Sequence, residues 1–292
     1  MTHSLTIRLR GLTIRVSPAV LALLPISFAL GLAGYFCILF IAVTTHEMAH
    51  ILTARRFGLR TSQLNITPLG EMALIENTAS RPFSQRLSIL LAGPMTSLFL
   101  AAAAHCLSLL TTTPLPLADG FLRTNLAIGL FNLLPFCPLD GGRVFLLLLE
   151  RAIGIPPAHR FMHRLSAFGG LLLMAAGLVQ AVFFPFNLSL YCIGVYLRKT
   201  ALAARHLQAA DLYRDLVLRK IKTTFDRPLP IRHFAAPSLM PVKTAYTRLH
   251  WDSFHTYHLP NGTIVTEADL LRYIRENGLR GALEDCVRCR SL

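Results

Sequence analysis

Apolar residues dominate the first two thirds of the chain and fall into six stretches separated by short polar segments. A helix needs about 20 predominantly apolar residues to cross the hydrocarbon core of a bilayer. The fourth stretch contains Pro, Asp and Gly residues and the sixth is short, so we expect the least regular helices there. The pattern predicts six transmembrane helices, over residues 16–33, 35–54, 87–110, 121–149, 166–184 and 185–197.

A different pattern lies between the second and third stretches. Residues 61–80 alternate apolar and polar side chains around Pro68-Leu69-Gly70, which predicts a β-hairpin. The hairpin either enters the membrane, where protein or a water cavity must satisfy its backbone, or lies on the cytosolic surface. If it lies next to the active site, its edge strand is able to pair with an extended substrate peptide, which makes Pro68 and Gly70 candidate substrate-binding residues.

The last third of the chain is more polar. Residues 201–225 predict a basic, amphipathic helix that either lies against lipid headgroups or links two domains. After a proline-rich segment, short strands, a turn at 260–262 and a helix at 267–276 capped by Thr266 predict a small α+β tail. The predicted domains are a membrane-embedded unit at 1–199, a linker helix at 200–225 and a cytosolic domain at 226–292.

Composition supports this fold class, a polytopic α-helical membrane protein. Hydrophobic residues make up 53% of the 292 residues and charged residues only 15%, whereas soluble domains carry about 25% charged residues. Lys and Arg gather in every second loop, which places those loops and both termini in the cytosol. The net charge of +14 therefore requires no nucleic acid, because anionic headgroups are the expected partner. An export signal is the alternative for the first stretch, but the second stretch follows it at once.

The clearest chemical signal is His46-Glu47-Met48-Ala49-His50, which lies inside the second apolar stretch. Residues four apart on a helix share one face, so His46 and His50 are able to hold one metal ion with Glu47 beside it. On a soluble protein, two surface histidines would be the simpler interpretation. Within a membrane helix such side chains are costly unless something binds them, and the motif therefore predicts a metal site.

A catalytic zinc ion usually takes three protein ligands, so the two histidines require another donor. Asp140 is the best candidate, because the prolines and paired glycines around it break the fourth stretch and let the backbone present a carboxylate. In the predicted topology the second and fourth stretches run in the same direction, which puts Asp140 at a depth similar to that of the histidines. The alternative is an ion pair between Asp140 and Arg143.

These residues predict zinc-assisted hydrolysis of a peptide bond. Zinc polarises the scissile carbonyl and lowers the pKa of water, and Glu47 carries the proton from that water to the leaving amine. Asn132, about two turns before Asp140, either helps to stabilise the oxyanion or bonds to neighbouring backbone. Cys286 and Cys289 form an isolated CxxC pair, for which we expect two thiols without a metal or redox role.

Several of these segments together resemble the site-2 protease family of intramembrane metalloproteases, peptidase family M50. The resemblance rests on the HExxH motif, the Pro-Leu-Gly hairpin, the segment Leu91-Ala92-Gly93-Pro94 and the run from Asn132 to Arg143. The arrangement of six spans followed by a cytosolic tail is similar to that of the sporulation branch of the family. The resemblance implies zinc ligands His46, His50 and Asp140, with Glu47 as the base.

The same resemblance implies a biological setting. Members of the sporulation branch trim the membrane-associated precursor pro-sigma-K in a bacterial inner membrane, on the mother-cell side of the forespore membrane, and partner proteins in that membrane hold them inactive. Their tail is a CBS-type domain, for which ATP is a candidate ligand. Here residues 226–278 have room for one CBS-like unit instead of the usual pair. A homo-oligomer is compatible with this setting.

Other functions fit parts of the sequence. A general site-2 protease, acting on anti-sigma factors or signal-peptide remnants, often carries a PDZ-like insertion, and the predicted external loops are too short for one. A zinc transporter would need polar residues that continue across the bilayer, and the outer halves of the predicted helices do not supply them. An inactive membrane scaffold would give no physical reason for Glu47 beside two histidines.

Overall fold

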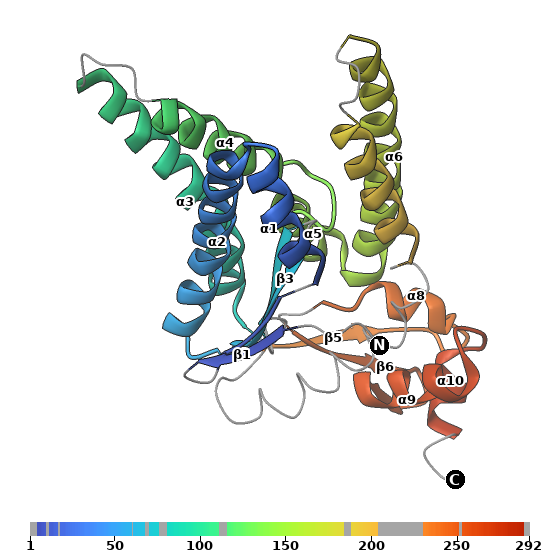
Figure 1. Cartoon of the computed structure of the whole chain (residues 1–292). Coiled ribbons are helices and arrows are strands. Elements are labelled where there is room, and N and C mark those ends of the chain that lie inside the picture. The colour runs from blue at the N-terminus through green and yellow to red at the C-terminus, as the bar shows by residue number, and fades with distance from the viewer. Residues whose placement is uncertain are drawn as a thin grey trace. The chain divides into compact units, whose positions relative to one another are not determined.

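The structure is a computed structural model of the chain, and it divides into two compact units (Figure 1). The first unit comprises Met1–Pro135 and Leu139–Val144, and the second comprises Phe136–Pro138 and Phe145–Leu292. The structure describes residues 5–9, 12–16, 18–59, 61–67, 70–75, 81–110, 116–183, 188–203, 230–250 and 253–288.

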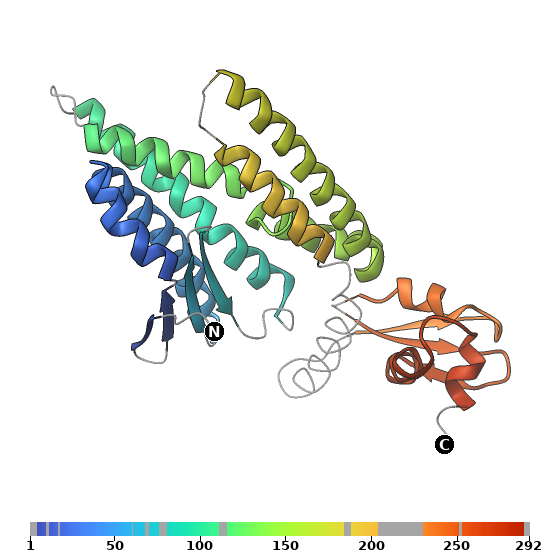
Figure 2. The same cartoon turned by 45° about the vertical axis from the view of Figure 1, so that its right-hand side comes forward.

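Helices α1 to α4 of the first unit lie side by side, with strands at one end of the bundle (Figure 2). Their bounds are α1 (Pro18–Ala29), α2 (Ala33–Arg56), α3 (Phe83–Leu110) and α4 (Pro116–Asn132). Helix α2, which carries the HExxH motif, packs against both α3 and α4. Groups on α2 are therefore buried on the sides that face these two helices.

In the described part of the chain, α2, α3 and α6 (Ile155–Phe183) are the helices long and apolar enough to cross a membrane. Large apolar side chains such as Phe40, Phe99 and Phe168 are exposed on them, as expected of surfaces that lipid covers. Helix α1, with 12 residues, is shorter than a full crossing, and α4, with 17, lies at the lower limit for one. These helices fit an integral membrane protein, and the number of six crossings stays a prediction.

A four-stranded sheet with the order β1-β2-β3-β4 belongs to the first unit. β3 (Thr61–Thr67) pairs antiparallel with β4 (Gly70–Ile75), which confirms the predicted hairpin, although its depth in a membrane stays a prediction. β1 (Leu5–Leu9) and β2 (Leu12–Val16) form a second antiparallel pair, and β2 runs parallel to β3. The pattern of apolar and polar residues did not predict this pair. β4 is a terminal strand of the sheet and packs beside α2.

The fourth apolar stretch is two helices and not one. Helix α4 ends at Asn132, and α5 (Asp140–Ile153) begins after an irregular turn, so the prolines and glycines break the stretch as expected. A Cβ atom on Gly141 would overlap the backbone carbonyl of Leu133. Only glycine allows the start of α5 to approach the end of α4 so closely, and this approach fixes where α5 begins.

The second unit contains α6, a helix over residues 189–203 and the polar tail. The tail has a sheet with the order β5-β6-β7, whose buried face packs with α8, α9 and α10 around a core that includes Tyr257 and Leu270. The bounds are β5 (Ile231–Ala235), α8 (Val242–Thr247), β6 (Phe254–His258), β7 (Ile264–Thr266), α9 (Glu267–Asn277) and α10 (Leu283–Arg288).

The tail confirms the predicted α+β character and the helix that begins after Thr266. The predicted turn is also present, with a positive φ of 78° at Gly262 and the Asn261 side chain accepting a hydrogen bond from the backbone N–H of Thr263. Residues 204–229, which hold nearly all of the predicted linker helix, lie outside the described residues. The domain boundary at residue 199 and the CBS-like character of the tail stay predictions.

The N-terminus of α9 provides a test of the tail. The Thr266 hydroxyl accepts from the Asp269 N–H, and the Asp269 carboxylate accepts from the Thr266 N–H, which together form a capping box. We expect Thr266→Ala to lower the free energy of unfolding of α9 by about 1 kcal/mol, measured by amide hydrogen exchange in detergent. The exposed Thr244 serves as the control, and equal α9 protection in Thr244→Ala and Thr266→Ala would contradict the assignment.

Candidate metal centre

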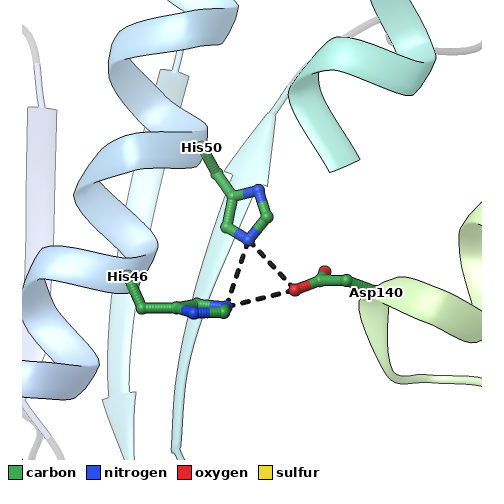
Figure 3. A group of neighbouring side chains, drawn as sticks. All are labelled: His46, His50 and Asp140. Atoms are coloured by element: carbon green, nitrogen blue, oxygen red, sulfur yellow. Dashed lines mark hydrogen bonds and ion pairs between the residues drawn. The ribbon is translucent and has the colours of Figure 1, made fainter. Parts of the chain in front are cut away.

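Two imidazoles of α2 face each other one helical turn apart. The Nε2 atoms of His46 and His50 are 3.3 Å apart, and both side chains are buried (Figure 3). This arrangement follows from the helix itself, because residues four apart lie on the same face. The pairing predicted from the HExxH spacing is therefore present in the structure.

Asp140 completes the group from the other side of the site. Its Oδ2 atom lies 3.1 Å from the Nε2 atom of His46 and 3.1 Å from that of His50 (Figure 3). Asp140 is the first residue of α5 and is also buried, whereas Arg143 is exposed. The bonds of Asp140 to both histidines favour the predicted donor role over the alternative ion pair with Arg143.

Helix α3 holds the outer side of both imidazoles. The Nδ1 atom of His50 lies 2.7 Å from the backbone carbonyl of Ile89, and the Nδ1 atom of His46 lies 2.9 Å from the Ser97 hydroxyl. Gly93 lies between these two positions, and a Cβ atom there would overlap the Nε2 atom of His50. Because the three α3 residues are spaced by four, one face of α3 supports the site.

The donor set fits a divalent cation. The Ile89 carbonyl can only accept, so the Nδ1 atom of His50 carries the proton, and the Nε2 atom of the neutral ring presents a lone pair. That lone pair faces a carboxylate oxygen and a second imidazole nitrogen. In tetrahedral coordination, two ligand atoms that each lie about 2.0–2.1 Å from a zinc ion are about 3.3 Å from one another. The three separations of 3.1, 3.1 and 3.3 Å therefore fit Zn²⁺.

The other predicted site residues are Glu47, Asn132, Pro68 and Gly70. Glu47 is half-buried on α2 and directly follows His46. The Asn132 side chain, at the end of α4, donates to the Ile128 carbonyl at 3.0 Å, which is the second of its two predicted roles. Pro68 lies outside the described residues, and Gly70 begins β4.

No local sequence pattern marks the α3 residues that support the histidines. A carbonyl such as that of Ile89 has no side-chain signature, and Ser97 is a common residue in an apolar stretch. Gly93 belongs to the segment Leu91-Ala92-Gly93-Pro94, which carries part of the resemblance to a family. The available signal was the four-residue spacing of Ile89, Gly93 and Ser97, which becomes informative once the partner helix is known.

Gly93 offers a test of the close approach between α2 and α3. A Cβ atom in Gly93→Ala would lie 2.6 Å from the His46 Nε2 atom and would overlap that of His50, so both imidazoles must move. We expect zinc affinity to fall at least about 10-fold, measured by chelator competition in detergent. Gly34→Ala is the control, because a Cβ atom there would make only an ordinary contact of 3.9 Å. Wild-type affinity in Gly93→Ala would contradict the geometry.

Comparisons with known proteins agree with this site. The sequence profile of peptidase family M50 matches residues 34–122 and 112–176. Stage IV sporulation protein FB of Bacillus subtilis is 30% identical over 161 residues, which cover 55% of this chain and 54% of that protein. A zinc metalloprotease of Methanocaldococcus jannaschii is 26% identical over 151 residues, which cover 51% of this chain and 44% of that one. The chain spans about half the length of these curated relatives.

A solved structure has a similar fold. The site-2 protease from Methanocaldococcus jannaschii matches with a TM-score of 0.55 and 22% identity, covering 69% of this chain and 94% of that one. The residues matched by the family profile include both histidines and Asp140, so the profile and the donor geometry point to the same part of the chain. The chain belongs to peptidase family M50, the site-2 protease family.

Proposed function

We propose that the chain is a zinc-dependent endopeptidase that cuts a membrane-associated protein within or near the bilayer. The observation that carries the proposal is the buried group of His46, His50 and Asp140, two of whose members lie on a helix apolar enough to cross a membrane. Family M50 membership and relatives named as zinc metalloproteases support the same activity. Hydrolysis then takes place where the α2 helix meets α3 and α5.

The residues divide the chemistry between them. His46, His50 and Asp140 hold the ion, and a bound Zn²⁺ supplies Lewis-acid chemistry that polarises the scissile carbonyl and acidifies water. Glu47 takes a proton from the attacking water and later donates it to the leaving amine. Glu47 directly follows His46 and lies on the same helix as His50, which supports this role because it keeps Glu47 near two of the three donors.

The substrate enters as an extended peptide. A helical peptide bond is shielded by its own hydrogen bonds, so the segment to be cut must unwind first. β4 is a terminal strand beside α2, and such a strand offers backbone donors and acceptors along its outer edge. Gly70, the first residue of β4, and Pro68, which precedes it in the sequence, are candidate contacts. Asn132 has two N–H donors, so its bond to Ile128 still allows it to stabilise an oxyanion.

The preferred substrate is pro-sigma-K, cut near the cytosolic face of a bacterial membrane. Similarity to Stage IV sporulation protein FB of Bacillus subtilis supports the sporulation setting. Inhibitory membrane partners and a homo-oligomer belong to the same proposal. Relatives named only as zinc metalloproteases support the alternative, a general site-2 protease acting on anti-sigma factors or signal-peptide remnants. ATP binding by the tail stays a prediction.

The decisive variant is Glu47→Gln, which keeps the size of the side chain and removes its ability to accept a proton. We expect cleavage of co-expressed, membrane-tethered pro-sigma-K to fall at least about 100-fold, measured by immunoblot. Zinc content should stay at the wild-type level, because Glu47 is not one of the three donors.

Glu276→Gln, an exposed carboxylate on α9, is the matched control and should cleave like the wild type. Cleavage by Glu47→Gln at the wild-type rate would remove Glu47 from the mechanism. Wild-type cleavage of a tethered anti-sigma factor, with pro-sigma-K left intact, would overturn the substrate while leaving the peptidase proposal in place.

A further inference from the structure

The two histidines of the metal centre are held by chemically different groups. The outer nitrogen of His50 meets the Ile89 carbonyl, and that of His46 meets the Ser97 hydroxyl. A carbonyl oxygen only accepts hydrogen bonds, whereas a hydroxyl both donates and accepts. The proton of His50 is therefore fixed on Nδ1 by the backbone, while the position of the His46 proton depends on what Ser97 does.

His46 has two arrangements that satisfy its neighbours. In one, Nδ1–H donates to Ser97, and the Nε2 lone pair faces the Asp140 carboxylate and the His50 nitrogen. In the other, the Ser97 hydroxyl donates to Nδ1, and Nε2–H donates to Asp140. Only the first arrangement leaves Nε2 able to bind a metal ion, so it is the one that zinc selects.

We propose that Ser97 is a positioning residue that orients the His46 ring and accepts the hydrogen bond of its Nδ1–H in the metal-binding tautomer. This inference rests on the proposed zinc site. Ser97 is fully buried, so bulk water is unable to replace its hydroxyl when it is removed. The hydroxyl acts through His46 and has no role of its own in bond cleavage.

The path of α3 explains why a serine occupies this position. Ile89, Gly93 and Ser97 lie on one face of the helix. Ile89 contacts the His50 ring and Ser97 contacts the His46 ring. Gly93, between them, lies against the Nε2 atoms of both rings. At Ile89 the helix backbone supplies the acceptor. One turn beyond Gly93 a side chain must supply it, and Ser is short enough to reach Nδ1 at 2.9 Å from a fully buried position.

The test compares substitutions at Ser97 in the full-length chain in detergent, with the zinc dissociation constant from chelator competition as the readout. We expect Ser97→Ala to weaken zinc binding by about 10–100-fold, the effect typical of losing a group that orients a ligand. Ser97→Cys, nearly the same size with a weakly bonding thiol, should resemble Ser97→Ala and covers the case that the alanine variant folds poorly. Ser97→Thr keeps the hydroxyl and should restore most of the affinity.

Ser108→Ala is the matched control, because Ser108 is an exposed residue of the same helix. It should bind zinc like the wild type. Wild-type affinity in Ser97→Ala would overturn the positioning role, and equal weakening in Ala, Cys and Thr variants would show a packing effect instead. Failure of the wild type to bind zinc would overturn the proposed function and this inference together, whereas zinc binding unaffected by Ser97→Ala would overturn only the inference.

Discussion

The central constraint is the burial of two imidazoles and a carboxylate among apolar helices. Each group is costly to bury, and the three point acceptor atoms at one another with separations of 3.1–3.3 Å. A divalent cation held by His46, His50 and Asp140 would replace this mutual repulsion with coordination. The break between α4 and α5, the glycine that lets α5 approach α4, and the close contact of α3 with α2 all serve to bring these three groups together.

Helix α3 has a larger part in the site than its composition indicates. None of the three proposed metal donors lies on α3. One face of α3 nevertheless supplies the Ile89 carbonyl and the Ser97 hydroxyl, which bond the two histidines, and Gly93, whose lack of a side chain leaves room for their rings. A ligand that is held from behind loses less freedom when the ion binds, which strengthens coordination. We therefore expect substitutions at Gly93 and Ser97 to affect the proposed metal centre, although neither residue is one of its three donors.

The HExxH spacing and the break around Asp140 were readable from the sequence because both express local rules, namely helix periodicity and the effect of Pro and Gly. The hairpin at β3 and β4 was also predicted from alternation. The β1–β2 pair was missed, since β2 ends at Val16, where the apolar stretch begins. Ser97 was missed because its importance depends on a tertiary contact across 51 residues, which no local pattern encodes.

X-ray absorption spectroscopy at the zinc edge, on the purified chain, measures the coordination sphere directly. The structure predicts one zinc ion per chain with two imidazole nitrogens and a carboxylate oxygen at about 2.0–2.2 Å. A sulfur ligand at about 2.3 Å, or a chain that retains no zinc after purification without chelators, would contradict the account.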